Sequence, residues 1–461
     1  MIPFNFAAMP VTVDLAGRQA HTWAYSPTLP GPEIRVRRGD MIDLSLANRL
    51  PEDTTIHWHG INIDNVEDGV PGVTQKAVTP GSSYRYRFVV PDSGTYWYHS
   101  HVGLQLDRGL YGPLIVEDPD DEPVDLDQVI VLDDWLDGID GTPERTLSLL
   151  RSSMAGMGSM GGGSSMGNGG ESMAGMPGMG AVTSTTAAAA SPAMTSGLLG
   201  GDAGDVDYPL HLLNGRPPAD RPTYQVAAGG KVRLRLINAG SDTAYRFAVG
   251  GHRLTVTHTD GHPVQPVEVD TVLIGMGERY DVSFTLETGV WPVYAQAEGK
   301  QGWASALLRT TGTAGTAAPP AGARPAELQG TVLTYRQLTP TGTAALAARR
   351  PDRSYEVLLT GTMAGYRWGL GGDAHRLQVR QGERVRVTMR NTTRMWHPMH
   401  LHGHGFALSD LGGARKDTVN VLPGQTVSID FDADNPGQWM YHCHNTYHLA
   451  RGMATTLSYI S

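Results

Sequence analysis

The stretch that decides the fold is GQWMYHCH, residues 437–444, which is followed by His448 and Met453. It contains the only cysteine of the 461-residue chain, Cys443, between two histidines. A thiolate, imidazoles and a weak thioether form the ligand set of a blue-copper electron-transfer site. Because neighbouring side chains of a strand point to opposite faces, Cys443 would face one metal and the flanking histidines would face others. The stretch therefore predicts a strand that connects one copper site directly to a second.

One pattern of residues occurs three times along the chain. A Val-x-x-Gly segment is followed, nine residues after its glycine, by an asparagine, and apolar residues alternate between the two. The glycine and asparagine pairs are Gly39 and Asn48, Gly229 and Asn238, and Gly382 and Asn391. Alternation with a period of two marks a half-buried strand. The chain is therefore predicted to be all-β, with three β-sandwich domains of one kind at residues 1–122, 123–318 and 319–461.

Two of the three repeats carry histidine pairs at equivalent positions, and the middle repeat carries none. The pairs are His57 and His59 with His99 and His101 in the first repeat, and His400 and His402 with His442 and His444 in the third. Eight histidines from two related domains predict a metal cluster at the interface between these domains. Ser100 stands in the first repeat where the third has Cys443, so no blue-copper site is expected in the first domain.

The composition excludes several other classes of protein. The formal net charge is −10 and no basic block is present, so nucleic acid is not expected as a partner. A single cysteine excludes an internal disulfide framework. No apolar run is long enough to span a bilayer, and the first residues lack the charged and apolar segments of a signal peptide. With 58 glycines and 30 prolines, the chain suits many short strands joined by turns.

The chain resembles the three-domain multicopper oxidases, a laccase-like family with cupredoxin domains. The motifs that carry the resemblance are His57-Trp58-His59-Gly60, His99-Ser100-His101, His397-Pro398-Met399-His400-Leu401-His402, and His442-Cys443-His444 with His448 and Met453. All four stand in the order of the family. The resemblance implies three consecutive cupredoxin-like Greek-key β-sandwich or barrel domains, of which the first and third share a trinuclear copper site. The middle domain would hold no copper ligand and would carry a flexible insertion at about residues 152–197.

The resemblance also implies four copper ions and a ligand set for each. The type 1 copper takes His397, Cys443, His448 and the axial Met453. The type 2 copper takes His57 and His400. The type 3 pair takes His59, His99 and His444 on one copper, and His101, His402 and His442 on the other. Neutral imidazole is the form of histidine that binds copper. Trp58 and Trp97 are expected to pack around the cluster, and the seven other histidines, including His211 and His404, to be surface or ordinary polar residues.

The family reaction is the one-electron oxidation of a reducing substrate at type 1 copper, coupled to the four-electron reduction of dioxygen to water. Electrons would pass from Cys443 to His442 and His444. Asp68, nine residues after His59, is expected to relay protons, the alternative being a turn residue before a glycine. Some bacterial relatives have a glutamate directly after the last type 1 histidine, but this chain has Leu449 there, so that proton route is absent or uses another group.

Between residues 151 and 197 the composition narrows to methionine, glycine, serine and alanine. The methionines of this segment are Met154, Met157, Met160, Met166, Met173, Met176, Met179 and Met194. Thioether is a soft ligand that selects Cu(I), and some bacterial copper-resistance oxidases have similar segments. We therefore expect the segment to capture Cu(I), and part of it to form a short helix over the type 1 site that hinders bulky phenols. The alternative is a low-complexity insertion with no role.

Several functions stay open from the sequence. The first is a cuprous oxidase of copper tolerance with laccase activity on phenols and aromatic amines, and the second is a laccase whose insertion is incidental. A copper-sequestering protein without turnover belongs to a different class. A ferroxidase is disfavoured because no acidic cluster beside His448 is evident. The resemblance further implies a monomer located in the periplasm, in the cell envelope or outside the cell.

Overall fold

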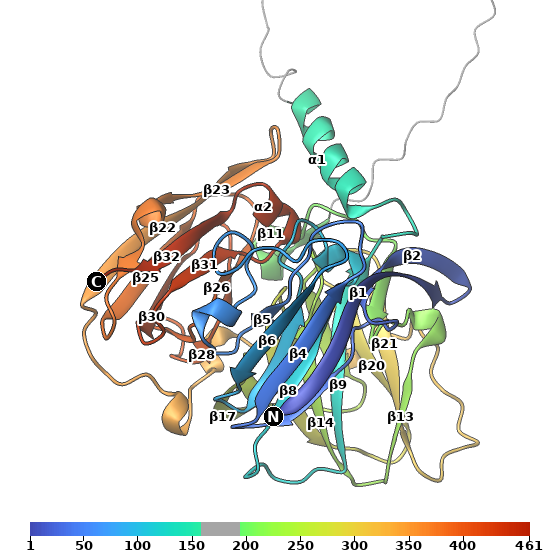
Figure 1. Ribbon diagram of the computed structural model, residues 1–461. Coiled ribbons are helices and arrows are strands. Elements are labelled where there is room, and N and C mark those ends of the chain that lie inside the picture. The colour runs from blue at the N-terminus through green and yellow to red at the C-terminus, as the bar shows by residue number, and fades with distance from the viewer. Residues whose placement is uncertain (158–193) are drawn as a thin grey trace, which may run out of the picture.

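Strands dominate the computed structural model, which describes residues 1–157 and 194–461. They form three pairs of facing sheets, one pair in each predicted domain, together with one small two-stranded sheet. Figure 1 shows the first pair from blue to cyan, the second from turquoise to yellow and the third from orange to red. The three-domain all-β prediction is confirmed. The boundaries at residues 122 and 318 stay predictions.

The first domain has two four-stranded sheets, with the orders β2-β1-β4-β6 and β3-β8-β7-β5. The strands of the first sheet are β1 (Ile2–Leu15), β2 (Arg18–Tyr25), β4 (Met41–Asn48) and β6 (Ser83–Val89). The strands of the second are β3 (Ile34–Arg37), β5 (His57–His59), β7 (Gly94–His99) and β8 (Tyr111–Glu117). Buried residues of both sheets, such as Leu44 and Tyr98, form one hydrophobic core, so burial of the apolar faces holds the two sheets together.

The middle domain repeats this arrangement with longer sheets. The sheet of order β12-β9-β14-β19-β16-β17 contains β9 (Leu126–Trp135), β12 (Leu210–Leu213), β14 (Lys231–Asn238), β16 (Leu254–Thr259), β17 (His262–Val269) and β19 (Arg279–Thr285). The sheet of order β13-β21-β20-β15-β18 contains β13 (Thr223–Val226), β15 (Tyr245–Val249), β18 (Val272–Ile274), β20 (Val290–Ala297) and β21 (Trp303–Thr310). Phe247 and Val249, which stand where the other repeats have histidines, are fully buried in its core.

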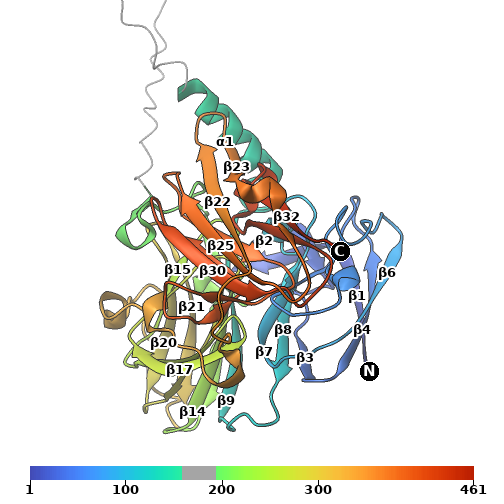
Figure 2. The same cartoon turned by 90° about the vertical axis from the view of Figure 1, so that its left-hand side faces the viewer.

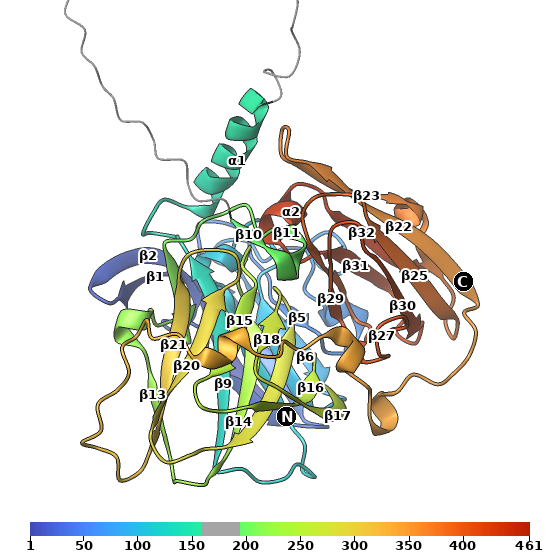
Figure 3. The same cartoon turned by 180° about the vertical axis from the view of Figure 1, so that it is seen from behind.

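The third domain has a six-stranded and a five-stranded sheet. The sheet of order β23-β22-β25-β30-β27-β28 contains β22 (Arg353–Thr362), β23 (Arg367–Gly372), β25 (Arg384–Asn391), β27 (Phe406–Leu408), β28 (Arg415–Lys416) and β30 (Thr426–Asp432). The sheet of order β24-β32-β31-β26-β29 contains β24 (Gln378–Val379), β26 (His397–Leu401), β29 (Thr418–Val421), β31 (Gln438–Cys443) and β32 (Ala454–Tyr459). Figures 2 and 3 show this domain beside both of the others.

The asparagine of each repeat has the same structural role in all three domains. Asn48, Asn238 and Asn391 are buried, and each ends the strand that the alternation predicts. Each side-chain oxygen accepts a hydrogen bond from the main-chain N–H two residues later. Each amide nitrogen donates to two main-chain carbonyls, one of them about 30 residues further along. The asparagine thus ties the end of its strand to a later part of the same domain.

Two helices lie on the side of the third domain where β31 ends. The helix α1 spans Pro143–Met157, and Leu150 on it is buried in the hydrophobic core of the third domain. The helix α2 spans Thr446–Ala450 and directly follows β31. Figure 1 shows α1 extending outward above α2. Among the described residues, none of the helices is long and apolar enough to cross a membrane.

Candidate metal centre

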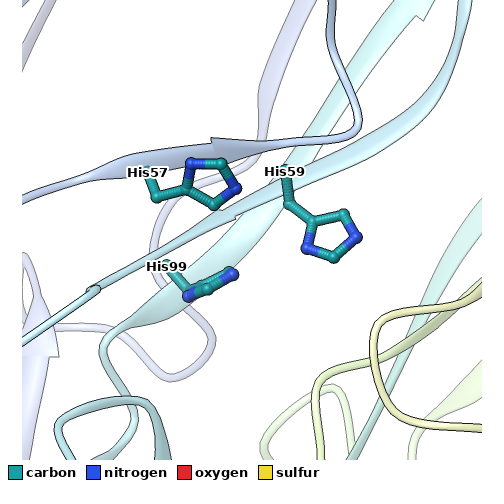
Figure 4. A group of neighbouring side chains, drawn as sticks. All are labelled: His57, His59 and His99. Carbon is teal, nitrogen blue, oxygen red and sulfur yellow. The ribbon is translucent and has the colours of Figure 1, made fainter. Parts of the chain in front are cut away.

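Neighbouring strands of the first domain bring its histidines together. In the pairing of β5 with β7, His57 stands opposite His99, and His59 stands opposite Trp97. Figure 4 shows the three imidazole rings of His57, His59 and His99 grouped on these two strands. One ring nitrogen from each lies within 4.8 Å of the others. His101 follows directly after β7, and its ring centroid is 5.5 Å from that of His57.

The third domain supplies the other half of the cluster from equivalent strands. In the pairing of β26 with β31, His400 stands opposite His442, and Met399 stands opposite Cys443. The alternation along β31 therefore separates the two kinds of ligand, as the sequence predicts. Cys443 is buried in the hydrophobic core of the third domain, whereas His442 on the other face lies 5.1 Å, centroid to centroid, from His101 of the first domain.

All eight histidines meet between the first and third domains. The rings of His59, His99 and His444 have centroids 4.9–5.7 Å apart. The rings of His101, His402 and His442 have centroids 5.0–5.1 Å apart. His57 and His400 lie 6.0 Å apart and link the two groups. Rings also approach across these sets, with His57 stacked on His402 and His59 on His400, each pair at 3.8 Å between centroids. The structure therefore brings all eight histidines together, and their division into type 2 and type 3 ligands stays a prediction.

Hydrogen bonds select which nitrogen of each imidazole faces the cluster. In His57, His99, His400 and His442 the Nδ1 atom donates to a main-chain carbonyl 2.8–2.9 Å away, so Nε2 is left as the acceptor. The Nε2 atom of His442 lies 3.0 Å from that of His402. His59 is reversed, because its Nε2 bonds to Asp417 Oδ1 at 3.1 Å and its Nδ1 has no partner. Among the described residues, the other ring nitrogens without a partner include Nε2 of His57, His99, His101 and His400, and both nitrogens of His444.

Burial favours the uncharged, metal-binding form of seven histidines in this region. Loss of solvation, followed by the proximity of other histidines, holds the pKa of seven histidines well below the ordinary value. They are His59, His99, His101, His397, His402, His442 and His444. A cluster of neutral rings whose free nitrogens converge is an arrangement that a metal ion stabilises.

Two buried carboxylates contact different histidines of the cluster. Asp68 ends the 3-10 turn Asn65–Glu67, and its carboxylate lies 3.1–3.2 Å from Nδ1 of His402. Asp417 contacts His59 and also accepts a bond from Nδ1 of His400 through its main-chain carbonyl at 2.9 Å. Burial alone would raise the pKa of Asp417, but the guanidinium of Arg279 holds that pKa well below its usual range. The structure thus places Asp68 at the cluster; its role as a proton relay stays a prediction.

A second group of ligand atoms surrounds Cys443. The Cys443 Sγ lies 3.7 Å from Nδ1 of His397 and 3.7 Å from Nδ1 of His448, and the two nitrogens are 3.1 Å apart. Two atoms that each lie about 2 Å from one metal ion have such a separation. Met453 is fully buried, and its carbonyl accepts the main-chain N–H of Cys443 at 3.0 Å. Burial raises the pKa of the thiol, and metal binding would displace its proton.

The far nitrogen of His448 reveals a residue that the sequence did not indicate. Asp205 Oδ2 lies 3.0 Å from His448 Nε2 and also accepts a bond from the hydroxyl of Tyr366 at 2.7 Å. The structure thus places one acidic group beside His448, although the sequence made no acidic cluster evident there. The contact joins positions 243 residues apart, so spacing alone could not show it. The available signal was a glycine-rich acidic turn, residues 201–205, directly after the methionine-rich segment.

Aromatic side chains cover the same histidine. The Trp368 ring packs on the His448 ring at 4.1 Å between centroids, and Tyr366 lies 6.2 Å away. Both come from the hairpin of β22 and β23. His448 and His397 are 0% exposed. Leu147 and Leu150 of α1 pack in the hydrophobic cluster that contains Trp368. This helix begins eight residues before the methionine-rich segment, so a helix formed by that segment over the type 1 site stays a prediction.

Other expectations have mixed outcomes. Trp97 packs on His59 and His99 at 4.5–4.9 Å, but Trp58 points into the core of the first domain beside Phe88. Its position between His57 and His59 on a strand requires this opposite direction. His211 and His404 are buried and hydrogen-bonded rather than exposed.

Leu449, which directly follows His448, lies beside the histidine cluster. Leu449 lines a pocket of about 20 Å³ together with His99, His101, His442 and His444. That volume is enough for about one water molecule. The pocket wall formed by Leu449 is apolar, so this residue supplies no proton to the cluster.

The predicted methionine ligands fall largely outside the described structure. Met160, Met166, Met173, Met176 and Met179 lie outside the described residues. Met154 and Met157 belong to the last turns of α1. Met194 is half-buried and packs with Leu199, Ala203 and Trp396.

Sequence comparisons agree with the geometry of both sites. Three profiles described as multicopper oxidase match residues 8–121, 181–313 and 350–460. The multicopper oxidase MmcO of Mycobacterium tuberculosis is 44% identical over 98% of this chain and 86% of its own length. The copper resistance protein A of Escherichia coli is 30% identical over 98% of this chain and 91% of its own length. The chain is a multicopper oxidase.

Solved structures of other multicopper oxidases share the fold. The laccase from B. aclada, as its L499M mutant, superposes with a TM-score of 0.75 at 25% identity, covering 100% of this chain and 87% of that one. Fet3p, a multicopper oxidase that functions in iron import, has a TM-score of 0.78 at 20% identity, with 99% and 90% coverage. At that identity Fet3p supports the fold alone. For this multicopper oxidase, copper fits both ligand groups, because buried neutral imidazoles and one thiol present convergent free atoms.

Proposed function

We propose that this chain is a cuprous oxidase with broader laccase activity, and that it holds one type 1, one type 2 and a pair of type 3 coppers. When bound, these ions would supply one-electron oxidation of a donor and four-electron reduction of dioxygen to water. The observation that carries the proposal is the backbone of residues 442–444, which joins the ligand group of Cys443 to the histidine cluster within one residue on either side. No longer path between the two groups is needed.

The ligand sets follow the two groups described above. The type 1 site would use His397, Cys443 and His448 with axial Met453. The type 2 site would use His57 and His400. The type 3 sites would use His59, His99 and His444, and His101, His402 and His442. Cys443 and its two histidine neighbours form the electron path.

Protons would reach the cluster through a residue other than Leu449. Asp68 is the acid best placed to serve, because its carboxylate touches His402 and its carbonyl accepts from His57. The carboxylate can hold a proton within one hydrogen bond of the cluster. The same contacts orient both rings, so Asp68 also positions ligands.

The surroundings of His448 support a small cationic donor. The ring has no solvent-exposed surface and is covered by Trp368, so a bulky phenol cannot stack on it without moving that indole. Asp205, 3.0 Å from the far nitrogen of His448, would attract a cation, and the electron of that cation would pass to the type 1 site through His448. Cu(I) is such a donor, and the methionine-rich segment would deliver it by soft thioether coordination.

Two other functions remain as alternatives. A laccase with an incidental insertion would oxidise phenols and aromatic amines in preference to Cu(I). A copper-sequestering protein would bind the ions without turnover, which would leave the linked ligand groups without a purpose. Location outside the cytoplasm, in the periplasm, the cell envelope or the medium, fits an enzyme that handles free copper, and we propose it together with a monomeric state.

Oxygen consumption by the copper-loaded protein tests the proposal. Cu(I) and a simple phenol are compared as donors, with the intact chain and with residues 152–195 replaced by a short Gly-Ser linker. The replacement keeps Leu147 and Leu150 of α1, which pack in the core of the third domain, but removes the end of α1 and Met194. We expect Cu(I) to be preferred and the replacement to remove that preference while phenol oxidation rises. An unchanged preference would make the segment incidental, and absent oxygen uptake with either donor would indicate sequestration.

A further inference from the structure

The middle domain contributes no cluster histidine, yet one of its side chains reaches the ligand shell. Arg279, the first residue of β19, is 0% exposed. Its guanidinium forms two parallel bonds to the carboxylate of Asp417 in the third domain, at 2.7 and 2.5 Å. It also donates to the main-chain carbonyl of Thr95 in the first domain at 3.1 Å. One arginine therefore joins all three domains at a single buried point.

The partner of this arginine contacts two of the cluster histidines. Asp417 Oδ1 lies 3.1 Å from Nε2 of His59, and the Asp417 carbonyl lies 2.9 Å from Nδ1 of His400. The remaining polar contact of His59 Nε2 is the hydroxyl of Thr418 at 3.2 Å. Space around the contact is full, because a Cβ placed on Gly60 would lie 2.2 Å from the Arg279 guanidinium and 2.5 Å from the Asp417 carboxylate.

The middle domain also fixes the main chain that carries Asp417. Asp260 Oδ2 accepts the N–H groups of Asp417 and Thr418, both at 3.1 Å. The other oxygen of Asp260 accepts the N–H of Arg279 at 2.9 Å. The adjacent Lys416 is buried against Asp260 at 3.1 Å. Both the side chain and the backbone of the aspartate are thus held by residues of the domain that has no copper ligand.

We propose that Arg279 and Asp417 form a positioning pair through which the middle domain assembles the trinuclear copper site. A carboxylate fixed at Nε2 of His59 keeps the proton on that nitrogen and turns Nδ1 toward the metal, in contrast to the four histidines that present Nε2. The carbonyl of the same residue fixes His400 in the ordinary orientation. The proposal rests on the copper assignment made above, and it adds two residues that position copper ligands without binding copper themselves.

The sequence is consistent with a role specific to the middle repeat. Each repeat also has a glycine with a positive φ two residues before a later strand, at Gly81, Gly277 and Gly424, and Arg279 stands two residues after the second of them. The equivalent residues of the other repeats, two positions after Gly81 and Gly424, are Ser83 and Thr426. A residue that serves only to begin a strand need not be buried there, because both counterparts of Arg279, Ser83 and Thr426, are exposed.

A matched ion pair allows this role to be separated from general packing. Arg235 and Asp281 are 3% and 2% exposed, and lie 3.2 Å apart in the middle domain. Both bond to the hydroxyl of Thr95 in the first domain. This control pair therefore crosses a domain interface in the same way but does not touch a predicted copper ligand.

The test compares the neutral double variant Arg279→Gln/Asp417→Asn with the control Arg235→Gln/Asp281→Asn. Copper per chain is measured after dialysis against a series of chelator concentrations, with the electron paramagnetic resonance spectrum of type 2 copper. The blue absorption of type 1 copper serves as the internal standard for a folded third domain. We expect copper retention at the trinuclear site to weaken by about 10- to 100-fold in the first variant, with an altered type 2 spectrum, and to be unchanged in the control.

Each outcome decides the question. Equal copper loss in both variants, or a full trinuclear site with an unaltered type 2 spectrum in the first, would overturn the proposal. If the double variant does not fold, Arg279→Lys keeps the charge but not the two-pronged contact, and the same selective loss is expected from it; full retention there would also overturn the proposal. A wild-type chain that binds copper without consuming oxygen would refute the oxidase function and leave the positioning result interpretable.

Discussion

Replacing Asp205 by asparagine should change the two classes of donor in opposite directions. The substitution keeps the shape of the side chain and an oxygen that can accept the Tyr366 hydroxyl, but it removes the negative charge 3.0 Å from His448 Nε2. We expect the reduction potential of the type 1 site to rise. A higher potential increases the driving force for every donor, so oxidation of a neutral phenol should become faster. Oxidation of Cu(I) should become slower because the attraction for a cation is lost.

The size of the effect follows from the contact distance. About 2 Å across the imidazole ring and about 2 Å from Nδ1 to a bound metal, added to the 3.0 Å contact, place the carboxylate about 7 Å from the ion. With an effective dielectric constant near 20, the interaction of unit charges at about 7 Å is about 2.4 kcal/mol. At about 2.3 kcal/mol per 100 mV, the potential should rise by about 100 mV. For Cu(I), losing more than about 1.4 kcal/mol of attraction lowers kcat/KM at least about tenfold.

Redox titration of the blue absorption and oxygen consumption with each donor are the assays. Asp202→Asn is the matched control, since Asp202 is half-buried on the same turn but bonds to the Gly204 N–H instead of His448. An unmoved potential in Asp205→Asn would refute the electrostatic argument. A parallel loss of phenol and Cu(I) oxidation would show that the residue is needed for folding or electron entry in general, and that its charge does not select the donor.

Three further predictions concern the electron path, the cover of the type 1 site and the response to acid. Cys443→Ser should abolish turnover of external donors while the histidine cluster stays loaded with copper, measured by metal content and oxygen uptake; full activity would refute the path through Cys443. Trp368→Leu should expose His448 and raise kcat/KM for phenols relative to Cu(I), with thermal unfolding as the check on stability. Burial lowers the pKa of His211 to about 3. Between about pH 6.5 and pH 3, His211 therefore stays unprotonated in the folded state, whereas in the unfolded chain it takes up a proton. Stability should therefore fall as pH decreases through that range, and chemical denaturation should show a shallower dependence in His211→Gln.

The sequence was sufficient for the fold because its signals are local. The distance from Gly39 to Asn48 fixes one strand, and the asparagine side chain forms the same bonds in all three repeats. The separation of Cys443 from its two neighbours follows from strand alternation alone. The expectation that Trp58 packs around the cluster was wrong because it ignored that alternation. Trp58 lies between two cluster histidines in sequence and points into the opposite core in space.

The residues that surround the ligands could not be predicted in this way. Asp205, Asp417 and Arg279 reach their histidines from positions remote in sequence, and each contact depends on how the domains pack. Burial makes these contacts consequential, because a carboxylate out of water is stable only beside a cation or several donors. No repeat or spacing records such a requirement. A single sequence therefore reveals the side chains that bind a metal, because their spacing follows strand periodicity. It does not reveal the charged residues that contact those ligands, because these contacts depend on how the domains pack.

The middle domain contacts both copper-ligand groups although its own repeat has no predicted copper ligand. It supplies Asp205 to His448 at one copper group, and Arg279 to Asp417 at the other. Lys300 and Asp242, a fully buried pair of the same domain, extend the first contact, since Asp242 accepts a bond from Asn445, the N-cap of α2, at 2.6 Å. Because α2 carries His448, a shift of this domain would disturb both copper groups at once. The domain without ligands is thus the part of the chain best placed to set the geometry of the two sites together.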